Sequence, residues 1–228
     1  MMEREDMKLI RDENGLSLAA DGQVLRGDFT KMIPRVKQGA ISKELLARAA
    51  KIKDADRPLV AIDATAGLGE DSLILAAAGF YVKMFERNPV IHELLEDALA
   101  RAAEVLELRD IVARMELNHG DSVEAMRNLD FTPDVILLDP MFPERQKSAL
   151  VKKKLQVIQK LEIPCADEAD MILTAMAAKP KKLIVKRPPK GPYLAGLKPD
   201  FSIEGKAVRF DGFASPYERL EKFRKEIR

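Results

Sequence analysis

The stretch that decides the fold runs from Pro58 to Glu86 and reads "PLVAIDATAGLGEDSLILAAAGFYVKMFE". It begins with an apolar run that ends at Asp63, and this predicts a buried strand, because the strands of a parallel sheet are covered on both faces. A helix is predicted over 70–79, where Gly79 closes it, and a second strand follows over 80–86. A strand, a helix and a strand in this order predict a βαβ unit.

The same alternation continues toward the C-terminus. The further predicted elements are a helix from Asn88-Pro89, a strand over 111–117, a helix over 122–129, a strand over 134–139, helices over 147–161 and 167–178, a strand over 181–187, two strands around Glu204-Gly205 and a helix or a frayed tail over 216–228. This order predicts an α/β fold with a Rossmann-like sheet that is mostly parallel and carries an antiparallel hairpin at its C-terminal end.

Residues 1–40 differ from the remainder of the chain. Short apolar runs are separated by Asn14-Gly15 and Asp21-Gly22, and such pairs favour the positive φ values of hairpin turns. We therefore predict a small N-terminal β subdomain over 1–40 and a main domain over 41–228. Ser42 is predicted to cap the first helix of the main domain.

Composition limits the classes of function. The 228 residues carry 38 basic and 37 acidic side chains, a net charge of +1, so bulk charge does not indicate a nucleic-acid partner. A single cysteine, Cys165, excludes a disulfide within the chain and fits a reducing compartment. The charged N-terminus and the absence of an apolar run of about 20 residues predict a cytoplasmic protein without a membrane partner. No metal is expected, because neither His92 nor His119 has ligand-type residues at a suitable spacing.

Two glycines, Gly67 and Gly69, lie in the turn between the first strand and its helix. Ligands of open α/β sheets bind at this carboxyl edge, where glycine lets the backbone approach closely. The dinucleotide fingerprint is incomplete, and Glu70 and Asp71 would repel a pyrophosphate at the start of the helix. A ligand with cationic or hydroxyl groups fits better, while a tight turn without a ligand is the alternative interpretation.

Acidic residues also end the next two predicted strands. Glu86 is placed to accept the hydroxyls of a ribose, or it is a strand-end charge paired with Arg87. Asp121 and Ser122 follow the third strand, where the carboxylate and a backbone N–H are placed to bind an adenine. They also fit an ordinary N-cap of the next helix, and both roles are compatible.

Together these features resemble a class I S-adenosylmethionine-dependent methyltransferase. The acids that end four successive strands are Asp63, Glu86, Asp121 and Asp139. The family pattern D/E-x-G-x-G-x-G is met at Gly67 and Gly69, but Thr65 stands at its first glycine. The resemblance implies S-adenosylmethionine as cofactor and S-adenosylhomocysteine as product. A nicotinamide-dependent oxidoreductase is the rival that the incomplete fingerprint disfavours.

The segment Asp139-Pro140-Met141-Phe142 resembles the [N/D]-P-P-[Y/F] motif of methyltransferases that act on exocyclic amines. The lone pair of such an amine is delocalised into the ring, so Asp139 and the Pro140 carbonyl would accept its N–H groups and stabilise the charge that develops during attack. Phe142 would stack on the base, a contact worth roughly 1–3 kcal/mol. A core aromatic at Phe142 and a loop cap at Asp139 are the structural alternative.

Two basic sets surround this segment in the sequence. They are Arg145, Lys147, Lys152, Lys153, Lys154 and Lys160, and then Lys179, Lys181, Lys182, Lys186, Arg187 and Lys190. Such runs are often solvated faces. Because both sets are predicted to flank the methyl-transfer edge, we expect them to contact the phosphates of an RNA.

Four motifs narrow the resemblance: "DATAGLGEDSLILA", "FERNPV", "LLDPMFPERQKSALVKKKLQV" and "VKRPP". Over about residues 29–213 the chain is similar to the ribosomal RNA small subunit methyltransferase J family. The resemblance implies methylation of guanine N2 in bacterial 16S rRNA, with the rRNA or the 30S subunit as partner. The implied cofactor contacts are Glu70, Asp71, Glu86, Arg87, Asp121, Ser122 and Asp139.

Two further functions stay open from the sequence. The first is methylation of another amine, such as adenine N6 or a protein side chain. The second is a non-catalytic RNA-binding assembly factor that keeps the cofactor fold. The oligomeric state is also open, a monomer included.

Overall fold

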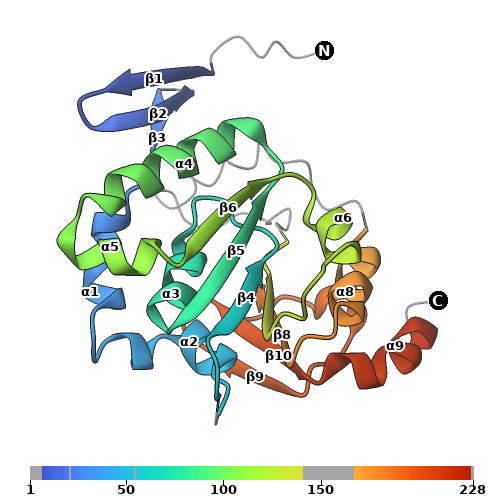
Figure 1. Cartoon of the computed structure of the whole chain (residues 1–228). Helices are drawn as coiled ribbons and strands as arrows, with labels where there is room; N and C mark the ends of the chain where they lie inside the picture. Colours follow the sequence, from blue (N-terminus) through green and yellow to red (C-terminus); the bar gives the residue numbers. More distant parts are fainter. Residues whose placement is uncertain (1–6, 21, 54, 141–166, 227–228) are drawn as a thin grey trace, which may run out of the picture.

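The computed structural model of the protein describes residues 7–20, 22–53, 55–140 and 167–226 (Figure 1). Its strands form a seven-stranded sheet in the order β6-β5-β4-β7-β8-β10-β9 and a separate three-stranded sheet in the order β1-β2-β3. The strands of the large sheet are β4 (Leu59–Asp63), β5 (Phe80–Glu86), β6 (Met115–His119), β7 (Val135–Leu138), β8 (Lys182–Arg187), β9 (Phe201–Glu204) and β10 (Arg209–Ala214).

The large sheet confirms the predicted topology. Strands β4 to β8 are parallel, and β10 pairs antiparallel with both β8 and β9. From β4 the chain builds outward to β5 and β6, and then returns to place β7 and β8 on the other side of β4. The strand order therefore reverses between β4 and β7, and ligands of open α/β sheets bind at the carboxyl end of such a switch point.

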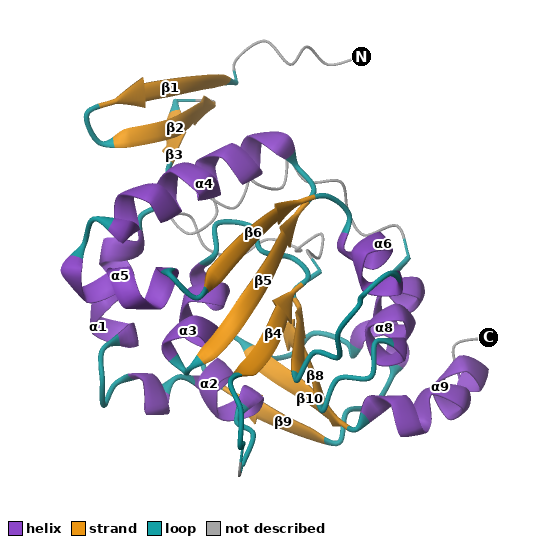
Figure 2. Ribbon diagram, viewed as in Figure 1, coloured by secondary structure: helices purple, strands orange, loops and turns teal. Residues whose placement is uncertain are grey.

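Helices cover both faces of the large sheet (Figure 2). The helices are α1 (Ile33–Val36), α2 (Leu45–Ala50), α3 (Glu70–Ala77), α4 (Pro89–Ala103), α5 (Leu106–Val112), α6 (Ser122–Arg127), α8 (Glu168–Ala177) and α9 (Leu220–Glu226). Successive strand residues alternate between two cores: Ala61 and Leu137 pack with α2 to α5, and Ile62 and Leu138 pack with α6, α8 and α9. The two-residue period of a strand thus explains why these strands are apolar throughout. Short 3-10 helices are η1 (Phe29–Met32), η2 (Ile41–Lys43), η3 (Leu194–Gly196) and η4 (Pro216–Arg219).

The N-terminal strands form the predicted hairpins. They are β1 (Lys8–Asp12), β2 (Gly15–Ala20) and β3 (Gln23–Leu25), paired antiparallel. Gly15 and Gly22 have φ values of 103° and 68°, as expected for glycines at hairpin turns. The apolar contacts that hold this sheet on α4 join Leu16, Leu18 and Leu25 to Ile91 and Leu94. The division of the chain at residues 40 and 41 stays a prediction.

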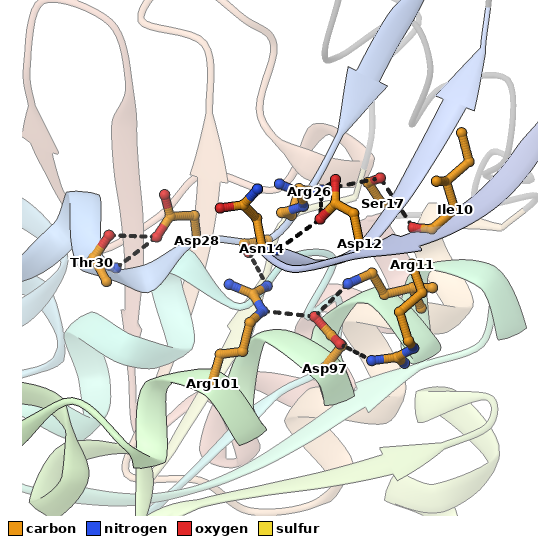
Figure 3. Close-up of polar contacts among 12 residues, drawn as sticks. Ile10, Arg11, Asp12, Asn14, Ser17, Arg26, Asp28, Thr30, Asp97 and Arg101 are labelled. Atoms are coloured by element: carbon orange, nitrogen blue, oxygen red, sulfur yellow. Dashed lines mark hydrogen bonds and ion pairs between the residues drawn. The ribbon is translucent and has the colours of Figure 1, made fainter.

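A buried carboxylate fastens the small sheet to α4. Asp97 accepts hydrogen bonds from the Leu16 N–H (2.9 Å), Arg101 Nε (2.8 Å) and Arg11 Nη1 (2.7 Å). Arg101 also donates to the carbonyl oxygen of Gly27 (2.5 Å). In Figure 3 both arginines point toward Asp97 from either side. This network satisfies a carboxylate that would otherwise be costly to bury.

Two local predictions were wrong. Ser42 lies inside η2 and donates to the carbonyl of Gly39 (3.4 Å), while α2 begins at Leu45 after Glu44. The third parallel strand begins at Met115 rather than at residue 111, because Leu106–Val112 forms α5. Leu108 and Val112 of that helix are one helical turn apart and both are buried, so the apolar residues followed a helical period.

Candidate active site

Asp63, at the carboxyl end of β4, lies beneath the glycine loop. Its side chain is buried, with 1% of the residue exposed, and it accepts hydrogen bonds from the Thr65 N–H (3.1 Å) and the Ser72 hydroxyl (2.6 Å). Burial raises the pKa of Asp63 to about 7, and the bond from Ser72 opposes this only in part. Asp63 therefore joins the loop to α3, and burial disfavours its ionised form.

The two glycines of the loop serve different purposes. At Gly69, where φ is 76°, an added Cβ would lie 2.7 Å from Leu95 Cδ1 and 3.0 Å from Phe29 Cζ, so close packing requires glycine. At Gly67, where φ is 54°, an added Cβ would meet nothing within 4 Å. The backbone at Gly67 is thus open to a ligand, whereas that at Gly69 is covered by the core.

Glu86 connects the end of β5 to this loop. One carboxylate oxygen accepts from the Gly67 N–H (3.0 Å) and the other from the Asn88 N–H (2.7 Å). Burial raises the pKa of Glu86, and the bonds from Asn88 and Gly67 oppose the rise. A carboxylate has about four lone-pair positions, so the backbone N–H groups of Asn88, Gly67 and Arg87 leave acceptor capacity for ribose hydroxyls. The ribose role of Glu86 and the cofactor contact of Arg87 stay predictions.

The loop after β6 lies beside that after β5, since the Gly120 N–H donates to the carbonyl of Glu86 (3.1 Å). Asp121 caps α6, accepting from the Val123 and Glu124 N–H groups at 2.7 and 3.2 Å, as predicted. Its carboxylate is exposed and Ser122 is buried. Contact of either residue with an adenine stays a prediction.

One feature of this rim was missed in the sequence. The rings of His92 and His119 pack edge to face with centroids 5.0 Å apart, joining α4 to the end of β6. Their separation in the chain gave no signal of this contact, which appears only once β5 and β6 are paired.

Asp139 follows β7, on the other side of the switch point. Its N–H donates to the Thr65 hydroxyl (2.8 Å), so the residue at the first glycine of the family pattern anchors the backbone of Asp139. The Asp139 side chain is 38% exposed and Pro140 is buried. Phe142 and the first basic set lie outside the described residues.

Lys186, at the end of β8, completes this side of the site. Its Nζ lies 2.9 Å from Asp139 Oδ2 and 2.5 Å from Asp71 Oδ2. Lys186 was expected to bind phosphate as one of the second basic set. Its ammonium instead binds the carboxylates of Asp71 and Asp139. It thereby links α3 to the loop after β7.

The prediction that the second basic set flanks the site as a whole was wrong. Lys182 Nζ donates to the carbonyls of Ala49 (3.1 Å) and Lys51 (2.6 Å), and Lys181 pairs with Asp134 (3.1 Å) just before β7. These lysines lie at the amino edge of the parallel strands. A strand advances about 3.3 Å per residue, which places Lys182 about 13 Å from Lys186.

The site therefore brings together Asp63, Asp71, Glu86 and Asp139 around an open glycine backbone. This excess of carboxylates suits a ligand that carries positive charge and hydroxyl groups, as S-adenosylmethionine does. Within the described ranges, no group of three or more histidine, cysteine or acidic side chains is arranged to hold a metal ion. The helices in that part of the chain include none long and apolar enough to cross a membrane.

Comparison with known proteins agrees with this geometry. Residues 1–215 match the family model SAM_MT, which describes SAM-dependent methyltransferases. Ribosomal RNA small subunit methyltransferase J of Thioalkalivibrio sulfidiphilus is 43% identical over 91% of this chain and 84% of its own length. The protein of the same name from Marinobacter nauticus is 41% identical over 89% of this chain and 76% of its own length.

Solved structures share the fold. The crystal structure of the SAM-dependent methyltransferase NGO1261 from Neisseria gonorrhoeae has a TM-score of 0.74 and 32% identity, covering 94% of this chain and 85% of that one. The rRNA methyltransferase aviRa from Streptomyces viridochromogenes shares the fold alone, with a TM-score of 0.54 at 17% identity over 80% of this chain and 86% of that one. The chain, a class I SAM-dependent methyltransferase by fold and cofactor, belongs to the ribosomal RNA small subunit methyltransferase J family.

Proposed function

We propose that the protein transfers the methyl group of S-adenosylmethionine to the exocyclic N2 amine of a guanosine in bacterial 16S rRNA, in the cytoplasm. The names of the relatives support rRNA as the substrate class. The position of Asp139 carries the proposal, because its backbone is bound to the cofactor loop through Thr65 while its side chain stays partly exposed. This contact would fix the position of Asp139 relative to the cofactor loop.

The residues that would hold the cofactor come from three strand ends. The open backbone at Gly67 would receive it, Glu86 would accept ribose hydroxyls, and Asp121 with Ser122 would border the adenine. Glu70 and Asp71 at the start of α3 favour its cationic groups, and Arg87 lies at its rim. When bound, S-adenosylmethionine supplies an electrophilic methyl group on a sulfonium.

Asp139 and Pro140 would orient the amine. An ionised carboxylate accepts an amine N–H, and the Pro140 carbonyl accepts the other, which turns the nitrogen lone pair out of the ring plane toward the methyl group. The carboxylate also stabilises the positive charge that grows on the nitrogen. Holding the two reactants in line is worth on the order of 7–11 kcal/mol. Phe142 would stack on a base that has been unstacked from its neighbours.

The test is a transfer assay with a mass-spectrometric readout. Labelled S-adenosylmethionine is supplied to assembled small subunits, to naked rRNA and to intact large subunits, and the methylated nucleoside is identified. We expect N2-methylguanosine from small-subunit RNA. N6-methyladenosine or a methylated protein would replace the proposed target by another amine, and no transfer to any substrate would favour a non-catalytic assembly factor.

Asp139→Ala should lower the single-turnover rate about 100-fold or more, by analogy with the loss of one group that stabilises transition-state charge. Cofactor affinity should change little, because the loop is held by Thr65 through the backbone. Asp130→Ala is the matched control, since Asp130 is an exposed aspartate outside the site. Normal turnover by the Asp139 variant would remove its proposed role.

A further inference from the structure

Lys186 makes contacts that the methyl-transfer scheme above does not use. Its Nζ lies between Asp71 Oδ2 (2.5 Å) and Asp139 Oδ2 (2.9 Å), and its side chain is 25% exposed. The three residues come from β8, from the first turn of α3 and from the loop after β7. One ammonium group therefore connects the helix of the cofactor loop to the loop that holds the proposed acceptor.

We propose that Lys186 is a positioning residue for methyl transfer: it fixes one oxygen of the Asp139 carboxylate, leaves the other for the substrate amine, and keeps that carboxylate ionised in an acidic site. This inference rests on the proposed function of Asp139. It goes further by naming the group on which the orientation and charge of Asp139 depend.

The sheet register explains how Lys186 reaches both partners. Leu138 pairs with Val185 on the neighbouring parallel strand, so Asp139 and Lys186 are the next residues on adjacent strands. Ile184 packs in the core on the α3 side, and residues two apart on a strand share a face. Lys186 consequently emerges on the side of the sheet where Asp71 lies.

The charges around Asp139 show how Lys186 acts on it. Desolvation raises the pKa of Asp139 and repulsion from Asp71 adds to the rise, whereas Lys186 and, to a smaller extent, Arg187 oppose it. A protonated Asp139 would present a donor in place of an acceptor and could not stabilise positive charge on the amine. Burial alone would lower the pKa of Lys186, but the carboxylates of Asp71 and Asp139 outweigh burial and raise that pKa above its usual value. Lys186 therefore remains charged wherever Asp139 must be ionised.

A purely structural ion pair is the competing explanation. Partly buried pairs contribute little net stability, because the cost of desolvation offsets their attraction. The two explanations differ in one observable, which is the pH at which the rate falls on the acidic side. A structural pair would change stability or the overall rate without moving this acidic limb of the pH–rate profile.

The experiment compares Lys186→Met, which keeps the length of the side chain, with Lys186→Arg, which keeps its charge. Single-turnover rates are measured from pH 5.5 to 9 on whichever nucleoside the wild type methylates. We expect Lys186→Met to lower the rate at pH 7 at least 10-fold and to move the acidic limb upward by about one pH unit or more. Lys186→Arg should restore the wild-type limb and much of the rate.

Lys182→Met is the matched control, because Lys182 is on the same strand but bonds two backbone carbonyls at the amino edge. Its acidic limb should coincide with that of the wild type. If Lys186→Met leaves the limb in place, whether or not its rate falls, the inference is overturned. If the wild type modifies a nucleoside other than guanosine, the proposed target fails while this comparison of limbs remains valid.

Asp71→Asn gives a second, opposite test should Lys186→Met fail to fold. It removes the repulsion from Asp71 and leaves the Lys186–Asp139 pair intact, so the acidic limb should move to lower pH. An unchanged or raised limb in Asp71→Asn would also overturn the inference.

Discussion

Two buried aspartates at opposite edges of the same sheet have opposite surroundings. Asp134, just before β7, and Asp63, at the end of β4, are each only 1% exposed. Asp134 accepts from the Val60 N–H (2.9 Å) and from both terminal nitrogens of Arg57 (2.8 and 2.9 Å), and it pairs with Lys181 (3.1 Å). Asp63 instead accepts from two neutral donors, the Thr65 N–H and the Ser72 hydroxyl.

The pKa values respond accordingly. Burial alone would raise the pKa of Asp134, but the bonds from Val60, Arg57 and Lys181 together lower it below the usual value. Burial raises the pKa of Asp63 to about 7, since the bonds from neutral groups only partly compensate. Cations of the fold thus neutralise the buried carboxylate at the amino edge, whereas burial disfavours the ionised form of Asp63 at the carboxyl edge.

The largest expected effect is the loss of stability on replacing Asp134, at the amino edge of the sheet. Asp134→Ala should lower the free energy of unfolding by about 3 kcal/mol. It leaves the Val60 N–H without its acceptor, and it leaves Arg57 and Lys181 without the carboxylate that they share. Chemical denaturation of the protein without cofactor measures this. Asp134→Asn keeps an acceptor for Val60 and should lose clearly less. Equal losses in the two variants would contradict a role for the backbone bond.

The pH dependence of stability tests the other aspartate. The folded-state pKa of Asp63 lies above its unfolded value, so its contribution favours folding at low pH and is lost as pH rises from about 4 to about 7. Between pH 5 and pH 8 this loss is about 2–3 kcal/mol. Asp63→Asn, which can still bond Thr65 and Ser72, should remove that part of the slope of unfolding free energy against pH.

The matched control for this slope is Asp134→Asn. The pKa of Asp134 is lowered in the folded state, so its stabilisation is lost only as pH falls below the usual range of aspartate. Its variant should keep the wild-type slope between pH 5 and pH 8. Glu86 adds to that slope with the same sign, because its pKa is also raised. A parallel slope in wild type and Asp63→Asn would contradict the assignment to Asp63.

Much of the fold could be predicted because its signals are local. The continuous apolar strands, the Asn88 cap followed by Pro89, and the glycine pairs of the N-terminal hairpins each depend on residues close in sequence. The misplaced start of β6 shows where prediction from such local signals fails. Ile111 and Val112 were predicted to begin this strand, but they end α5, where Leu108 and Val112 pack against the core.

From the sequence, the site could be predicted only as a set of acidic residues at the ends of strands. The acids that end the strands were found because parallel strands bring their carboxyl ends together. The Lys186 bridge, the bond of Thr65 to Asp139 and the burial of Asp63 depend on side-chain direction and on the register of β7 with β8. A run of six basic residues gave no sign that its members divide between two edges of a sheet.

We expect the two glycines to mark a ligand side of the loop, at Gly67, and a core side, at Gly69. Gly67→Ala should weaken cofactor binding about tenfold, or about 1.4 kcal/mol, since its Cβ would occupy the open space beside the loop. Its cost in unfolding free energy should be only that of a left-handed backbone, about 1–2 kcal/mol. Gly69→Ala should destabilise more, through its clash with Leu95. Calorimetric titration with S-adenosylhomocysteine and denaturation separate the two effects, and a normal affinity in Gly67→Ala would contradict the ligand side.

The smallest expected effect concerns which edge faces the RNA. Lys190 is exposed in the loop after β8, at the carboxyl edge, where Arg209 donates to the carbonyls of Pro189 (2.8 Å) and Gly191 (3.1 Å) and so supports the loop. Lys179, before β8, is exposed at the amino edge and lies over the ring of Tyr217. A lysine that neutralises one phosphate contributes about 1 to the slope of log K against log salt.

Lys190→Ala should therefore reduce that slope for small-subunit rRNA by about 1, and Lys179→Ala should leave it unchanged. The measurement is RNA binding at several salt concentrations, with each variant titrated beside the wild type. Because a single phosphate contact changes affinity only a few-fold at one salt concentration, the slope is the more reliable readout. The reverse result would place the RNA across the amino edge, far from Asp139, and would separate RNA binding from the proposed chemistry.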